Sequence, residues 1–123
     1  MTINEILKIE NVTEKIVTLY DFCSKQEVNT DTEKVIISIE DFENDVMNGG
    51  FSQYYKNKTE SEVNQVLIDL EKIGAKKSKA LFEKFLLNQS LDEELTDEFI
   101  KYEDNIQALM IKYTENNIKD FNK

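Results

Sequence analysis

Carboxylate side chains are the residues of this chain whose spacing could do chemistry. Four acids fall within residues 40–45 and five within residues 92–98. Paired carboxylates can do acid–base catalysis, but both stretches have the composition of solvated helix faces. On a helix, acids three or four residues apart lie about 5–6 Å from one another, which is similar in order to the spacing of phosphates along a nucleic-acid strand. We therefore predict exposed acidic edges that bind a basic partner, formed by Asp41, Glu43, Asp45, Asp92, Glu93, Glu94, Asp97 and Glu98. Acids at the start of a helix also stabilise its dipole, which explains part of the second stretch.

Other chemistry has few residues to carry it. The chain contains no histidine, which excludes serine–histidine and cysteine–histidine catalysis and ordinary zinc sites. The alternating acids of the first stretch resemble the first ligands of a calcium loop. However, Val46 stands where that loop needs glycine, and Ser52 stands where it needs glutamate. The single cysteine, Cys23, falls on an apolar stripe and is interpreted as a small buried side chain. We expect a non-enzymatic protein with no cofactor and no metal.

Composition indicates a soluble helical protein with an acidic surface. The chain has 123 residues, 40% hydrophobic and 33% charged, which predicts one globular domain over residues 1–123. It contains no proline, the main helix breaker. A formal charge of −10 disfavours direct binding to nucleic acid or to an anionic membrane. Since no membrane-spanning apolar stretch or signal-type segment is evident, we expect a cytoplasmic protein.

Apolar residues recur at helical spacing along nearly the whole chain. The pattern predicts an all-α, compact bundle of about six helices. The expected segments are residues 2–24, 32–48, 51–56, 59–73, 76–87 and 90–113. Capping boxes are predicted at three starts, by Thr2 with Glu5, Thr59 with Glu62 and Ser90 with Glu93. The β-branched residues 35–39 would alone favour a strand, but their apolar spacing continues as in a helix.

The stripes also predict which side chains form the core. The expected buried residues are Phe51, Tyr54, Leu67, Leu70, Phe82, Phe99, Tyr102 and Ile106. The longest stripe runs through the last segment for nearly three heptads, from Leu95 to Tyr113. Such a stripe predicts a helix–helix seam within the domain, with a homodimer seam as the alternative.

One short motif carries a family resemblance. The segment Asn48-Gly-Gly-Phe-Ser-Gln-Tyr-Tyr-Lys-Asn57 resembles the signature Asn-Gly-Gly-Phe-x-Gln-Tyr-Phe/Tyr-x-Asn of the bacterial DNA-mimic-protein family. The resemblance extends over about residues 35–115 and includes an Ile-Gly-Ala helix end at residues 73–75. It implies a small, acidic, all-helical protein that displays carboxylates like DNA phosphates to a DNA-binding regulator, in at least one relative as a dimer.

The motif residues themselves are interpreted as structural. Glycine adopts the left-handed conformation without steric cost, so Gly49 or Gly50 should have a positive φ and end a helix. Phe51, Tyr54 and Tyr55 should then turn inward. Gln53 and Asn57 have two interpretations, as helix caps or as the lining of a small site. The full set of motif residues is Asn48, Gly49, Gly50, Phe51, Gln53, Tyr54 and Asn57.

Three functions fit these observations. The leading one is a DNA mimic that occupies the basic DNA-binding face of a partner, such as a regulator. The second is an immunity or antitoxin-like inhibitor of a basic toxin or nuclease. The third is a structural helical domain that is acidic only for solubility.

Overall fold

All regular structure in the described part of this chain is helical. The computed structural model describes residues 1–101 and 104–121, and within them it contains no strand. The α-helices are α1 (Ile3–Leu7), α2 (Val12–Ser24), α3 (Asp31–Lys56), α4 (Glu60–Ile73), α5 (Lys76–Leu87), α6 (Asp92–Ile100) and α7 (Ile106–Asn116). Two short 3-10 helices follow α5 and α7, at Gln89–Leu91 (η1) and Ile118–Phe121 (η2). The prediction of an all-α protein is confirmed, including a helix over residues 35–39.

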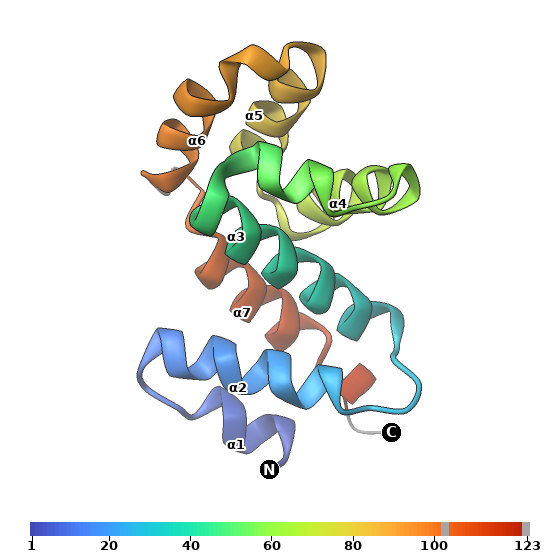
Figure 1. The fold of residues 1–123 in the computed structure, drawn as a ribbon. Coiled ribbons are helices and arrows are strands. Elements are labelled where there is room, and N and C mark those ends of the chain that lie inside the picture. Colours follow the sequence, from blue (N-terminus) through green and yellow to red (C-terminus); the bar gives the residue numbers. More distant parts are fainter. Residues whose placement is uncertain (102–103, 122–123) are drawn as a thin grey trace.

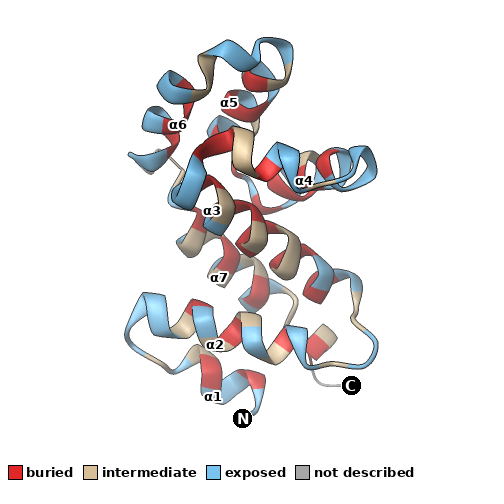
Figure 2. Cartoon of the chain, in the orientation of Figure 1, coloured by how far each residue is buried: buried red, intermediate tan, exposed pale blue. Residues whose placement is uncertain are grey.

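The long helix α3 organises the molecule. It packs against α2, α4, α6 and α7, while α5 bridges α4 and α6. In Figure 1, α1, α2 and the C-terminal end of the chain lie at one end of the molecule, and α5 and α6 lie at the other. One consequence is that α3 has buried residues on more than one face (Figure 2).

Aromatic rings fill the centre of the core. The ring of Phe42 lies 4.9 Å from that of Tyr54, 5.3 Å from that of Phe82 and 5.6 Å from that of Phe99, each in an edge-on arrangement. The burial prediction is confirmed for six residues, namely Phe51, Tyr54, Leu70, Phe82, Phe99 and Ile106. Leu67 is only partly buried, and Tyr102 lies outside the described residues. The inward orientation predicted for Tyr55 is wrong, because 39% of this residue is exposed.

Helix caps account for most of the segment boundaries. The capping boxes of Thr2 with Glu5 and of Thr59 with Glu62 are both present, and Gly74 ends α4 in the left-handed conformation. The predicted box of Ser90 with Glu93 is wrong. Ser90 belongs to η1, and α6 starts directly after it without a side-chain cap. At the start of α3, Thr30 forms a capping box with Glu33, so the helix begins at Asp31, one residue before the predicted start at residue 32.

Two predicted helices are each divided in two by an asparagine. Asn11 accepts a hydrogen bond from the Glu14 amide and starts α2, which separates α2 from α1. Asn105 has a φ of 46° and caps α7 through the Ala108 amide, which separates α7 from α6. An asparagine side chain can bond nearby backbone amides, so it can start a new helix within an apolar stripe. Asparagine also tolerates the left-handed backbone that Asn105 adopts. The predicted three-heptad seam is therefore wrong, and the homodimer stays a prediction.

Gly50 bends α3 near its C-terminal end. Its φ of 85° and ψ of 176° lie outside the helical region, so the helix continues after a kink. The predicted positive φ at Gly49 or Gly50 is confirmed at Gly50. The short helical turn predicted at residues 51–56 is the last part of α3.

We expect Gly50→Ala to lower the free energy of unfolding by about 2 kcal/mol, because this backbone region is accessible essentially only to glycine. An added Cβ would also lie 3.0 Å from Oδ2 of Asp92. The matched control is Gly74→Ala, which has the same φ of 85° but open space around its Cβ, and we expect about 1 kcal/mol there. Urea unfolding followed by circular dichroism measures both variants. Equal losses would show that the contact with Asp92 and the unusual ψ of Gly50 do not matter.

Candidate partner-binding surface

The acids of α6 provide the exposed negative charge that the sequence predicted. Glu93, Glu94, Asp97 and Glu98 are exposed. The ion pairs of the described residues join Lys25 to Asp21, Lys58 to Glu62 and Lys79 to Glu71. Within these residues, no α6 carboxylate is neutralised by a lysine. Their charge is therefore available to a partner.

The acids of α3 depart from the prediction of an outer acidic flank. Glu43 is 2% exposed and Glu40 is 6% exposed, so neither side chain lies on an exposed edge. Asp41 and Asp45 are half-buried, and Oδ1 of Asp41 accepts a 2.7 Å hydrogen bond from the Tyr20 hydroxyl on α2. Since neighbouring helices cover α3 on several sides, the face that carries Glu40 and Glu43 is turned inward.

Burial changes the protonation of these two glutamates. Desolvation raises the pKa of Glu40 to about 7, helped by the nearby charge of Glu43, while a hydrogen bond with Asn44 opposes the rise. Desolvation also raises the pKa of Glu43, against a hydrogen bond with Gln107 of α7. These carboxyls therefore act on stability more than on surface charge.

Asp92 holds the motif in place. The kink at Gly50 redirects two backbone amides toward α6. The Phe51 amide donates to Oγ1 of Thr96 at 3.2 Å, and the Ser52 amide donates to Oδ1 of Asp92 at 3.2 Å. The Thr96 hydroxyl also donates to Asp92, at 3.0 Å. Asp92 is half-buried and caps the last part of α3, so its role is structural in addition to any contact with a partner.

The remaining motif residues have separate positions. A Cβ on Gly49 would lie 1.9 Å from Oε1 of Gln53, so the Gln53 side chain folds over a space that only glycine leaves open. Asn57 is exposed and is the C-cap residue of α3, its amide donating to the Tyr54 carbonyl at 3.1 Å. Asn48 is exposed beside the kink. Asn57 ends α3 through its backbone amide, and the two interpretations of the Gln53 and Asn57 side chains stay predictions.

A groove joins the motif to the α6 acids. It has a volume of about 310 Å³, and the residues lining it include Met47, Gly49, Glu93, Asp97 and Ile100. Met47 is 37% exposed and Ile100 is 41% exposed, so the groove combines apolar side chains with carboxylates. Asp41 lines a different groove, between α3 and α4. The sequence analysis did not predict that the motif and the α6 acids lie beside one another. The signal available for it was the spacing of Asp92 and Thr96, which places both side chains on one side of a helix.

The comparison with protein families agrees with the family that the sequence predicts. The family described as DMP19-like protein matches residues 26–122, which include α3 to η2. The chain belongs to this family, and DMP19 is a DNA-mimic protein family. No curated protein and no solved structure matches the chain.

Two further properties bear on the kind of surface. Within residues 1–101 and 104–121, no helix is both long and apolar enough to cross a membrane. Over the same residues, no group of three or more acids and cysteines is placed to hold a metal ion. The features left to explain are the uncompensated carboxylates of α6 and the groove beside them.

Proposed function

We propose that this protein is a non-enzymatic DNA mimic whose α6 surface occupies the basic DNA-binding face of a partner protein. The observation that carries the proposal is the exposed set Glu93, Glu94, Asp97 and Glu98, which no lysine of the described residues pairs. Membership of a DNA-mimic family supports the same conclusion. Because Glu43 is buried and Asp92 is a cap, the mimic surface is centred on α6, and Asp41 and Asp45 are at most secondary contacts.

The physical basis is electrostatic complementarity. The fixed carboxylates of α6 repeat a negative charge along one helix edge and raise the rate of encounter with a positive surface. The groove beside them suits the side chain of a partner arginine or lysine, whose aliphatic stem packs on Met47 and Ile100 while its charged head reaches Glu93 or Asp97. A DNA-binding regulator presents such side chains on the face that contacts phosphates.

The test changes charge on α6 without changing shape. A tagged protein first captures the partner from the native cell at low salt. The affinity of the identified partner is then measured for the quadruple variant E93Q/E94Q/D97N/E98Q. We expect affinity to fall by about tenfold or more, equivalent to about 1.4 kcal/mol or more. Added salt should weaken the parent complex, because the Debye length shrinks from about 10 Å at 0.1 M to about 3 Å at 1 M.

The matched control is E10Q/E14Q/D21N/E27Q. These four acids are exposed, and replacing them removes the same charge as the α6 variant does. They belong to or flank α2, which lies at the end of the molecule opposite α6 (Figure 1). Duplex DNA should compete for the partner, while the protein itself binds no DNA. Equal effects of both variants, or affinity that is insensitive to salt, would contradict the proposal. A captured nuclease whose binding DNA does not displace would favour the immunity-type alternative.

A further inference from the structure

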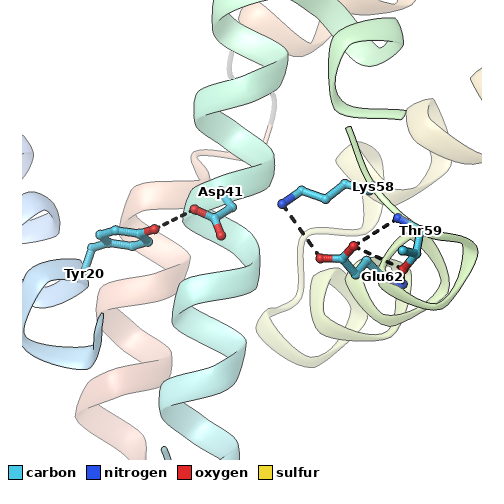
Figure 3. A network of polar contacts seen from close by, with 5 residues as sticks. All are labelled: Tyr20, Asp41, Lys58, Thr59 and Glu62. Carbon is cyan, nitrogen blue, oxygen red and sulfur yellow. Dashed lines mark hydrogen bonds and ion pairs between the residues drawn. The ribbon is translucent and has the colours of Figure 1, made fainter. Parts of the chain in front are cut away.

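A second groove lies between α3 and α4, away from the α6 surface. It has a volume of about 440 Å³ and is lined in part by Asn29, Lys34, Ile37, Asp41, Tyr54 and Lys58. This volume is within the range of pockets that hold small molecules. Figure 3 shows one part of it, where the Lys58 ammonium is directed across toward Asp41 while it pairs with Glu62. The proposed DNA mimicry makes no use of this groove.

The groove contains a buried polar atom that has nothing to bond. Oδ1 of Asn29 is buried without a hydrogen-bond partner among the described residues. Buried polar groups are nearly always bonded, so this open acceptor indicates a missing ligand or water. Tyr54 is 2% exposed and lines the same groove. Burial and the nearby charges of Glu62 and Asp41 raise the pKa of Tyr54, which keeps its hydroxyl protonated and able to donate.

The charges around the groove are of both signs. Lys34 and Lys58 are cationic, and Asp41 and Glu62 are anionic. Oδ1 of Asp41 accepts a hydrogen bond from the Tyr20 hydroxyl, which leaves Oδ2 as the open carboxylate oxygen for a ligand. The Lys58–Glu62 pair is long, at 4.0 Å, and is easily exchanged for a better partner. A ligand with one charge would meet both attraction and repulsion here, whereas a zwitterion complements both signs.

We infer that the groove between α3 and α4 binds a small zwitterionic molecule of the amino-acid class with an apolar side chain. Its carboxylate lies at Lys58 and Lys34, and its ammonium lies at the open oxygen of Asp41. Tyr54 donates its hydroxyl hydrogen to the ligand. Ile37 and the Tyr54 ring provide apolar surface for the side chain.

The test is a titration of the isotope-labelled full chain with L-leucine into the millimolar range, followed by amide chemical shifts. We expect saturable shifts of residues 34–41 and 54–62 and weaker or no saturation with acetate or methylammonium, which each supply one charge. Tyr54→Phe removes only the hydroxyl and keeps the ring contacts with Phe42 and Phe82. It should weaken binding about fivefold, the effect of one lost hydrogen bond. Lys58→Met should weaken it about tenfold, because a bond to a charged group is lost.

Lys77→Met is the matched control, because Lys77 is an exposed lysine of α5 that does not line this groove. It should leave the leucine affinity unchanged. Absence of saturable shifts with leucine would overturn the inference and assign the groove to water. Equal saturation by acetate would overturn the zwitterion in favour of a simple anion site. An unchanged affinity in Tyr54→Phe would overturn the role of the hydroxyl. None of these outcomes depends on partner binding by α6.

Discussion

Replacing Phe51 with alanine is expected to lower the free energy of unfolding by about 3–5 kcal/mol, the usual cost of removing a fully buried phenylalanine. Phe51 is 0% exposed. Its ring lies 5.5 Å from Phe82, 5.6 Å from Phe99 and 5.7 Å from Phe85. Since the surrounding rings are held by each other, the site cannot collapse well, and the cavity term adds to the lost transfer energy. Urea unfolding with a circular-dichroism signal measures the loss.

Tyr55→Ala is the control for this prediction. Tyr55 lies about one turn after Phe51 in α3. Its ring also contacts that of Phe85, with a centroid distance of 5.9 Å, but the residue is 39% exposed. We expect a loss of about 1 kcal/mol, in the range of ordinary point mutations. A loss of only about 1 kcal/mol for Phe51→Ala, as small as that of the control, would show that Phe51 is not a core residue, and the structural interpretation of the motif would be wrong.

Replacing Glu40 with glutamine is expected to stabilise the protein by up to about 3 kcal/mol above pH 7, and by much less near pH 4.5. A rise of the pKa from 4.5 to about 7 corresponds to about 3 kcal/mol between the two protonation states. Within this window the folded state binds more protons than the unfolded state, so the free energy of unfolding falls as pH rises through it. Glutamine cannot ionise, which removes the contribution of Glu40. The raised pKa of Glu43 acts in the same direction.

The measurement is urea unfolding of the parent and of Glu40→Gln at several pH values across this window. Glu94→Gln is the control, because it removes one charge from an exposed site and so separates local burial from general repulsion in an acidic chain. The control should follow the parent curve. A Glu40→Gln curve that also runs parallel to the parent would show that Glu40 is not buried as an uncompensated acid.

Local signals in the sequence were sufficient for the helices and for much of the core. The capping boxes at Thr2 and Thr59, the stripe of α4 and the glycine at residue 74 are short-range patterns, and the structure contains all of them. The positive φ at Gly50 was also predictable, because a pair of glycines between two amphipathic segments favours a break. These features depend on residues within about one or two helical turns of one another, so the chain itself carries the information.

Tertiary packing decided the direction in which the acids point. Glu43 reads as a surface residue in a charged run, but neighbouring helices cover α3 and turn it inward. Asp92 reads as a surface acid at a helix start, but it accepts a hydrogen bond from the Ser52 amide, next to a kink some 40 residues away along the chain. The predicted helix over residues 90–113 is likewise divided at Asn105, although the apolar spacing in the sequence continues through that point. Spacing specifies which residues share a face of one helix, whereas the elements that cover that face are brought there by distant parts of the chain.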